Sequence, residues 1–289
     1  IDAAGHAMKH LAALGLQFAT NNVYDLEDRY RDHLEAHLGP HMAPGSVLHL
    51  GSEDGNILDV SPAQIERPCD VLISGPPCPP WAGNGCKKGQ EDARSHVFVK
   101  ILQICILLIK CNELKMCVLE NVKGVLHAQK GQTSFMEKLV AVLSKEAPEF
   151  LWSYTVLSAE AYGLPQQRTR VFLRGLRACF GPIPDPWLLK MVTEGKVERA
   201  DIIVLPLDRS EDGVFNVHVC INVTPTLLTG NRYLFCMSCD IDKPRQHREF
   251  CRFLHPSERM TLQGFPSTLL PDAPATVRIQ GAGNAFPAS

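Results

Sequence analysis

The sequence predicts an α/β fold in which a parallel, doubly wound sheet carries a smaller β-rich lobe inserted near its end. Between residues 16 and 174, short apolar runs alternate with helical segments of about 10–15 residues, the pattern of strands joined by crossover helices. From residue 175 to about 250 this alternation stops, and proline, glycine and short β-like pieces replace it. The 289 residues are enough for one large core and an appended lobe.

Composition excludes several classes of protein. The 45% hydrophobic and 21% charged residues are ordinary for a globular chain, and the net charge of −2 gives no general attraction for nucleic acid. Eleven cysteines without a framework spacing favour a reducing compartment. The apolar run 97–109 contains Lys100 and Gln103 and is too short to span a bilayer. Because the chain starts at Ile1 and ends abruptly at Ser289, we expect a fragment of a longer protein with further domains.

The first elements follow from spacing and end signals. We predict helices at 2–14 and 25–38 and strands at 16–22 and 47–50. The first helix shows small and apolar residues at helical spacing and stops at Gly15. The second is amphipathic between Asp25, a possible N-cap, and Gly39. Residues 51–59 are rich in Ser, Asp, Glu and Gly and are expected to form a loop.

The apolar run 70–74 ends in Ser-Gly, which is typical of a buried strand entering a tight turn. Two prolines precede Cys78 and two follow it, so helix is excluded there. A cysteine on a stiff loop at the carboxyl end of a strand lies where open α/β sheets place their chemistry. By itself, Cys78 is better interpreted as inert, since most free cysteines are core residues.

The remaining elements of the first part are predicted as helices at 95–111 and 133–146 and strands at 116–119, 152–158 and 170–174. We expect the helix at 95–111 to be largely buried. Glu120 follows the strand at 116–119 directly, and without further context it fits an exposed strand-end carboxylate. Arg168 and Arg170 are two apart on an extended segment, so their side chains point the same way. Alone, they fit two solvated arginines on an edge strand.

The lobe at 175–250 carries β-like pieces at 202–205, 214–219 and 233–236. Its basic residues are Arg177, Lys190, Lys196, Arg199, Arg209, Arg232, Lys243, Arg245, His247 and Arg248. The run 243–248 is able to bind phosphates, although such a short run also fits a solvated loop. A structural zinc ion is a weaker alternative, with Cys220, Cys236, Cys239, His247 and Cys251 as its ligands. A short helix at 256–263, with Ser257 near its start, follows the lobe.

Six separated segments together resemble one family. They are Gly75-Pro76-Pro77-Cys78, residues 89–94, Glu120-Asn121-Val122, Gln166-x-Arg168-x-Arg170, residues 254–266 and Gly283-Asn284-Ala285. Each is a weak signal alone, but six in the right order over residues 70–286 are specific. The chain is similar to the cytosine-C5 methyltransferases, which use S-adenosyl-L-methionine to methylate cytosine in DNA and, in one branch, in tRNA.

The resemblance implies a Rossmann-like S-adenosylmethionine-dependent methyltransferase sheet. Residues 1–174 would form the first part of the catalytic domain, 175–250 a target-recognition lobe, and 251–289 the closing part. The substrate is expected to be DNA, with tRNA as the alternative, and no membrane partner is expected. The protein would be intracellular, and nuclear with a role in epigenetic regulation if its source is eukaryotic.

The resemblance also implies catalytic roles for four side chains. Carbon 5 of cytosine is a poor nucleophile, so a thiolate, here that of Cys78, adds at carbon 6 and makes an enamine able to take the methyl group. Glu120 is expected to neutralise the charge that this addition places on N3. Arg168 and Arg170 are expected to contact the target cytosine and its backbone and to help hold the thiolate.

The residues implied in binding S-adenosyl-L-methionine are Ile1, Asp2, Ala3, Val23, Tyr24, Asn56, Ile57, Pro77 and Asn284. The first three match the last part of a glycine-rich turn, and the family's preceding first strand is missing. Val23 replaces the acidic residue that grips the ribose, while Tyr24 remains able to stack on adenine. Asn56 replaces an Asp, although its carbonyl still accepts a hydrogen bond from an exocyclic amine. Pro79 stands where many members carry Gln or Asn. No metal is expected.

Two other hypotheses stay open. A degenerate methyltransferase fold would bind nucleic acid or a partner without turnover; the altered cofactor positions favour it and the intact Cys78, Glu120 and arginine pair oppose it. A thiol hydrolase that uses Cys78 with a histidine has no histidine in a recognisable pairing motif. For the enzyme acting on duplex DNA, base flipping is implied, because the target base must leave the stack to reach Cys78.

Overall fold

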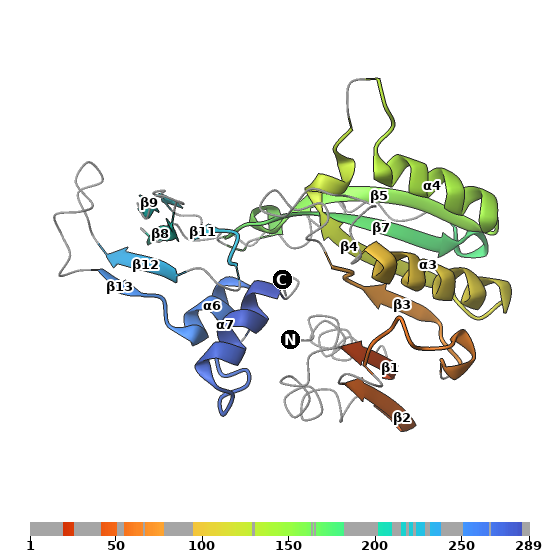
Figure 1. Cartoon of the computed structure of the whole chain (residues 1–289), viewed down its shortest axis with the longest axis horizontal. Coiled ribbons are helices and arrows are strands. Elements are labelled where there is room, and N and C mark those ends of the chain that lie inside the picture. Colours follow the sequence, from red (N-terminus) through yellow and green to blue (C-terminus); the bar gives the residue numbers. More distant parts are fainter. Residues whose placement is uncertain are drawn as a thin grey trace.

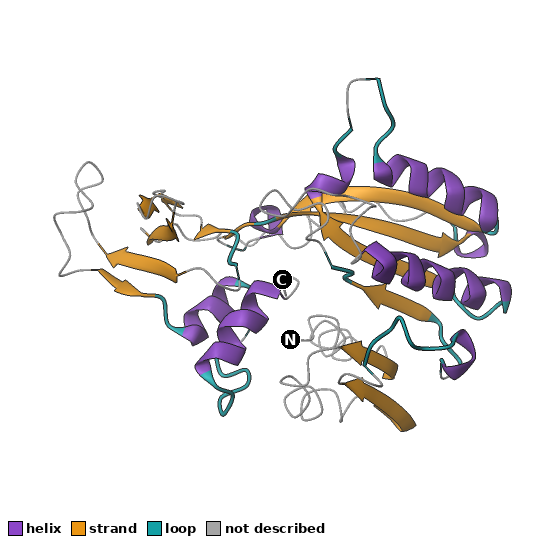
Figure 2. Cartoon of the chain, in the orientation of Figure 1, coloured by secondary structure: helices purple, strands orange, loops and turns teal. Residues whose placement is uncertain are grey.

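The computed structural model of the chain describes residues 20–25, 42–50, 55–65, 67–77, 95–128, 131–162, 164, 166–181, 202–209, 215–217, 220–221, 224–228, 232–237, 251–265 and 267–284. A larger part of strands and helices lies to the right in Figure 1, and a smaller β-rich lobe with two helices lies to the left. The same division is visible by secondary structure in Figure 2. The predicted helices at 2–14 and 25–38 lie outside the described residues.

The central sheet has the strand order β3 (Val71–Ser74), β4 (Met116–Val122), β7 (Thr169–Arg177) and β5 (Phe150–Ser158). β3 and β4 are parallel, whereas β7 runs antiparallel to both of its neighbours. The α/β class is therefore confirmed, but the prediction of an all-parallel sheet is wrong at β7. The link between β5 and β7 is too short for a crossover, which needs about a dozen or more residues, so the chain returns antiparallel.

The first two described strands form a parallel pair. They are β1 (Thr20–Asp25) and β2 (Met42–Leu50), which make a two-stranded sheet of their own among the described strands. They confirm the predicted strands near 16–22 and 47–50, with shifted bounds. The remaining short elements of the larger part are the 3-10 turns η3 (Pro62–Gln64), η5 (Lys123–Leu126), η6 (Ala159–Tyr162) and η7 (Ala178–Phe180).

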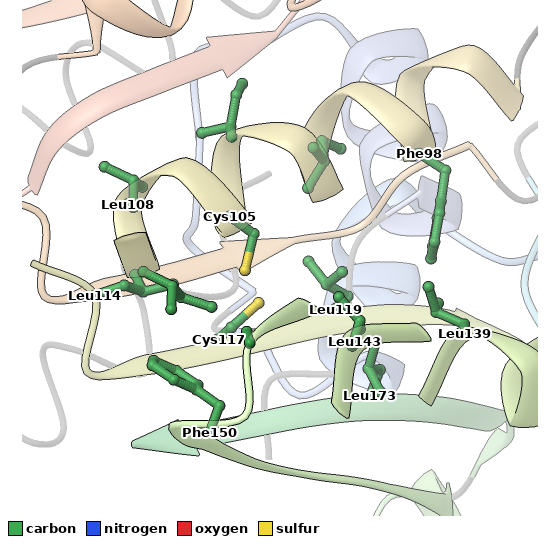
Figure 3. Close-up of a cluster of buried hydrophobic side chains, with 14 of the residues drawn as sticks. Phe98, Cys105, Leu108, Leu114, Cys117, Leu119, Leu139, Leu143, Phe150 and Leu173 are labelled. Carbon is green, nitrogen blue, oxygen red and sulfur yellow. The ribbon is translucent and has the colours of Figure 1, made fainter. Parts of the chain in front are cut away.

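Two helices cover one face of the central sheet, α3 (Ser95–Lys110) and α4 (Phe135–Glu146) (Figure 1). Residues of α3 at helical spacing pack on alternate residues of β4 and β7, and Figure 3 shows this core. Its labelled members are Phe98, Cys105, Leu108, Leu114, Cys117, Leu119, Leu139, Leu143, Phe150 and Leu173. α4 begins at a capping box in which Ser134 and Glu137 bond each other's backbone N–H.

Two predictions of burial need correction. α3 is buried on one side only, since Val99 is 50% exposed. β3 is likewise not buried on both faces, because Val71 and Ile73 are 38% and 45% exposed while Leu72 packs against the core. β3 is exposed on one face because, within the described ranges, α3 and α4 cover the Leu72 face of the sheet and no described helix packs on the other. α3 uses only one side to pack on that face.

The inserted lobe is an antiparallel sheet with the strand order β10-β8-β12-β13, and β9 pairs with β8. Its strands are β8 (Ile202–Arg209), β9 (Phe215–Val217), β10 (Cys220–Ile221), β12 (Arg232–Met237) and β13 (Cys251–Phe253). The predicted β-like pieces are thus confirmed. The lobe borders at 175 and 250 remain predictions; along the described strands, β7 continues to Arg177 and β13 pairs with β12.

Two connections join the lobe to the larger part. β11 (Thr224–Pro225) pairs in parallel with β6 (Gln166–Gln167), which directly precedes Arg168. Two packed helices follow the lobe, α6 (Pro256–Leu262) and α7 (Ala275–Asn284). α6 confirms the predicted helix at 256–263; His255 is its N-cap, and Ser257 lies in its first turn. None of the helices in the described part of the chain combines the length and apolar character of a membrane span.

Candidate active site

The sequence analysis predicted that Glu120 follows the end of its strand, but in the structure Glu120 lies inside strand β4. The reason is tertiary: β7 continues the pairing past Leu119, with Glu120 opposite Phe172 and Val122 opposite Arg170. The side chains of residues two apart in a strand share one face, so Arg170 lies diagonally across from Glu120. Arg170 Nε is 2.8 Å from Glu120 Oε1, and both side chains are largely buried.

Arg168 approaches the same carboxylate from the segment between β6 and β7. Its guanidinium is close enough to influence the charge of Glu120, and it is only 3% exposed. Its Nη1 donates a hydrogen bond of 3.3 Å to the carbonyl of Gly283, on the last turn of α7. The structure therefore rejects the interpretation of Arg168 and Arg170 as solvated arginines, and of Glu120 as an exposed carboxylate.

The electrostatics of Glu120 are set by two opposing effects. Burial raises the pKa of Glu120 above its ordinary value, and the positive charges of Arg170 and Arg168 hold back part of this rise. A carboxyl group with a raised pKa keeps its proton closer to neutral pH and is able to donate it to a basic atom of a bound molecule. The site thus combines a carboxyl group of raised pKa with two arginine side chains.

The loop that carries Cys78 begins next to this cluster. Cys78 itself lies outside the described residues, whose nearest segment ends at Pro77. Ser74 at the end of β3 is paired with Leu119, the residue before Glu120. The loop of Ser74 to Pro77 therefore leaves the sheet beside the strand that holds Glu120, as expected for chemistry at the carboxyl ends of neighbouring parallel strands.

The predicted cofactor residues are only partly described. Tyr24 and Ile57 are half-buried and pack against the main core. Val23, within β1, and Pro77, in the loop after β3, are also half-buried. Ile1, Asp2 and Ala3 lie outside the described residues, and so does the side chain of Asn284, the last residue of α7.

Asn56 is engaged in a local turn. Its Oδ1 accepts from the Leu58 N–H at 3.2 Å and its Nδ2 donates to Asp59 at 2.8 Å. An amide oxygen has two lone pairs, so Asn56 Oδ1 keeps one for an incoming amine. Tyr24, Ile57 and Asn56 are thus the described residues among the predicted adenine contacts, and Val23 supplies no carboxylate for a ribose.

The structure describes only part of the residues predicted to form a basic surface or a zinc site. Arg177, which sequence reasoning counted with the lobe's basic residues, instead donates to the carbonyl of Leu114 at 2.9 Å and lies over the ring of Phe150. It therefore stabilises the core. The residues of the basic run 243–248 and the side chains of the possible zinc ligands lie outside the described residues. Among the side chains that are described, no cluster of His, Cys, Asp or Glu is suited to a metal ion.

Sequence reasoning missed Gln263 and the carbonyl of Gly283. Gln263 is fully buried, and its Nε2 donates to the carbonyl of Ala282, next to the carbonyl that accepts from Arg168. The only sequence signal was the position of Gln263 inside the motif at 254–266, which gives no indication of a contact 19 residues away.

Comparison with known proteins identifies a family match and a fold match. The family model described as C-5 cytosine-specific DNA methylase matches residues 49–199, slightly more than half of the chain. The Type II methyltransferase M.HpaII of Haemophilus parainfluenzae is 31% identical over 140 residues, which are 47% of this chain and 37% of that enzyme. The Type II methyltransferase M.NgoBV of Neisseria gonorrhoeae is 34% identical over 134 residues, 44% of this chain and 31% of the relative. The matched part of this chain thus spans about a third of the length of these relatives.

Two solved structures share the fold over nearly the whole chain. One is a mutant of Spodoptera frugiperda DNMT2, with a TM-score of 0.63 and 16% identity over 98% of this chain and 93% of that one. The other is the S. pombe Dnmt2 methyltransferase, with a TM-score of 0.67 and 15% identity over 99% and 92% of the two chains. At these identities, the likeness establishes the Rossmann-like methyltransferase fold.

Proposed function

The chain belongs to the C-5 cytosine-specific DNA methylase family, and we propose that it transfers a methyl group to carbon 5 of cytosine in DNA. This family uses S-adenosyl-L-methionine as its methyl donor. The observation that carries the proposal is the buried cluster of Glu120, Arg170 and Arg168 beside the strand that leads to Cys78. The DNA substrate is supported by the family and by the Type II relatives.

In the proposed reaction, the Cys78 thiolate forms a bond with carbon 6 of the flipped cytosine, and the electron pair of the carbon 5–carbon 6 double bond moves toward N3. Glu120, whose pKa is raised by burial, donates its proton to N3. When bound, S-adenosyl-L-methionine supplies an electrophilic methyl group, which carbon 5 takes. The methyl donor would leave as a neutral thioether. Loss of the carbon 5 proton to a base, return of the N3 proton to Glu120 and expulsion of Cys78 would then restore the aromatic ring, the Glu120 carboxyl and the free thiolate.

The arginines have separate tasks in this proposal. Arg170 holds the Glu120 carboxyl in place through the 2.8 Å contact and presents the remaining donors of its guanidinium to the cytosine. Arg168, held by α7, adds positive charge that favours the Cys78 thiolate and the phosphate next to the target base. Replacing both Arg168 and Arg170 by neutral residues would leave the buried Glu120 without these counter-charges.

We assign the adenine of the cofactor to described residues with suitable side-chain chemistry, and the rest of the cofactor to residues at the start of the chain. Tyr24 and Ile57 would pack on the ring, Asn56 Oδ1 would accept from its amine, and Pro77 would border the site. The family motifs add Ile1, Asp2, Ala3, Val23 and Asn284.

The lobe at 175–250 is proposed to recognise the target. β11, which contacts β8 and β10 of the lobe, pairs with β6 beside Arg168, so a nucleic acid on the lobe would lie near the arginine cluster. A nuclear location and an epigenetic role stay predictions for a eukaryotic source.

Transfer of labelled methyl from S-adenosyl-L-methionine to duplex DNA and to tRNA, measured side by side with the full chain, tests this function. We expect label on DNA, none on tRNA, and loss of label in Cys78→Ala. Label on tRNA alone would replace DNA by tRNA as the substrate. If the folded protein labels neither, the non-catalytic hypothesis replaces this one, and the replaced acidic positions Val23 and Asn56 become the first explanation. Turnover in Cys78→Ala would remove that residue from its role.

A further inference from the structure

We propose that Gln263 is a positioning residue, which acts through the C-terminal end of α7 to hold Arg168 beside Glu120. The side-chain amide of Gln263, at the end of α6, contacts a backbone carbonyl at the end of α7. The neighbouring carbonyl of α7 contacts the guanidinium of Arg168. The effect of Gln263 on turnover rests on the proposed function, whereas its effect on the charge of Glu120 does not.

The first link is the end of α7. The last carbonyls of a helix have no partner within the helix and need donors from elsewhere. Two adjacent ones are satisfied from other elements: the carbonyl of Ala282 accepts from Gln263 Nε2 at 2.5 Å, and that of Gly283 accepts from Arg168 Nη1 at 3.3 Å. The two contacts therefore constrain the same turn of α7.

The second link is charge. The C-terminal end of a helix carries a partial negative charge, which cations stabilise. α7 has no basic residue in its last turn, so its own sequence does not supply that cation. Arg168, 115 residues earlier in the chain, supplies it. The end of α7 thus attracts the guanidinium and fixes where its charge lies.

The third link is Gln263 itself. Its backbone N–H bonds the carbonyl of Met260 and ends α6, while its side chain bonds α7, so one residue joins the two helices. Gln263 is fully buried, and its Oε1 has no hydrogen-bond partner within the described part of the chain. Because a carbonyl accepts only from the NH₂ end of the amide, the contact with Ala282 defines which way the amide faces.

The consequence reaches Glu120 through Arg168. Among the described residues, two charged groups face the Glu120 carboxylate, Arg170 on β7 and Arg168 beside α7. Without the Gln263 contact, the last turn of α7 is free to move from Arg168, and Glu120 loses part of one of its two counter-charges. Within the described part of the chain, Arg170 contacts Glu120 and Thr169 and not α7, so its 2.8 Å contact with Glu120 remains and the effect is partial.

Gln263→Leu tests the proposal, because leucine fills a similar volume without a donor. We expect kcat to fall about fivefold to tenfold, which corresponds to the loss of one hydrogen bond of about 1 kcal/mol. Less positive charge near Glu120 raises its pKa further, so the loss of activity at high pH moves to higher pH. The matched control is Thr261→Val, which removes a hydrogen bond within α6 and should change neither quantity.

Gln263→Met gives a second uncharged variant of similar length that lacks the donor, in case the leucine variant does not fold. The titration of the Glu120 carboxyl is measured in each full-length protein by ¹³C NMR, with Glu120→Gln identifying the signal. A higher pKa of Glu120 in the Gln263 variants supports the proposal, even if no protein transfers methyl, in which case the proposed function alone fails. Unchanged titration overturns it, whether kcat is normal or reduced, because Gln263 would then have no role or only a structural one.

Discussion

The two faces of strand β4 differ in what they do. Cys117 and Leu119 point toward α3 and α4 and are fully buried in an apolar core. Glu120 points to the opposite face, which carries the ion pair with Arg170 and, further along, the exposed Val71, Ile73 and Met116. Because side chains alternate along a strand, one segment of seven residues serves stability on one face and the candidate chemistry on the other. Changes on the two faces should therefore have separable effects.

The largest effect is expected from Glu120→Gln. The amide keeps the shape of the side chain but is not able to donate a carboxyl proton, so the rate of methyl transfer should fall about 10²–10⁴-fold with nucleic-acid binding retained. Single-turnover methyl transfer and a binding assay measure the two quantities. Glu160→Gln makes the same chemical change at an exposed site and should transfer methyl at the wild-type rate. A full-rate Glu120→Gln would remove Glu120 from its assigned role.

On the other face, Leu119→Ala should reduce the free energy of unfolding by about 2–5 kcal/mol, since it leaves a cavity under α3. Urea denaturation measures the loss. Val118→Ala, one residue away on the half-buried opposite face, should cost less than half as much. Equal losses at the two positions would show that the faces do not differ in packing.

The pH dependence of stability tests the face of β4 that carries Glu120, because this face holds a buried titratable group. Glu120 has a raised pKa in the folded chain, so between its ordinary and its raised value the folded state binds more protons than the unfolded state. Stability contributed by the protonated group is therefore present at low pH and is lost as pH rises through this window. The free energy of unfolding of the wild type should fall relative to that of Glu120→Gln across this range. A constant difference between the two would contradict the raised pKa.

The smallest effect is expected at the start of α4, which covers the packed face. Ser134→Ala removes the Oγ that accepts from the Glu137 N–H at 3.2 Å, which should cost about 1 kcal/mol of stability. Thermal unfolding measures this, and the rate of methyl transfer at temperatures where the protein is folded should not change. A slower rate in this variant would couple α4 to the site across the sheet.

Local patterns were sufficient for most of the fold. The apolar runs that became β3, β4 and β5, and the helical spacing of α3 and α4, were all readable in order because each is a short-range property of the chain. Strand ends were not, since β4 extends through Glu120 to Val122 only because β7 pairs with it. The direction of β7 was predicted wrongly as parallel, and the short link before it explains why the strand runs antiparallel.

For the candidate site too, the sequence and the tertiary structure supplied different information. The sequence by itself determined the family and named Glu120, Arg168 and Arg170 as candidate site residues, because their motifs are local. Only the tertiary structure decided their environment: the burial that raises the pKa of Glu120, the Arg170 contact across two strands and the capture of Arg168 by α7. It also moved Arg177 from the lobe's basic set to the core. Burial and charge pairing depend on residues distant in the chain, and the spacing of a motif carries no information about those distances.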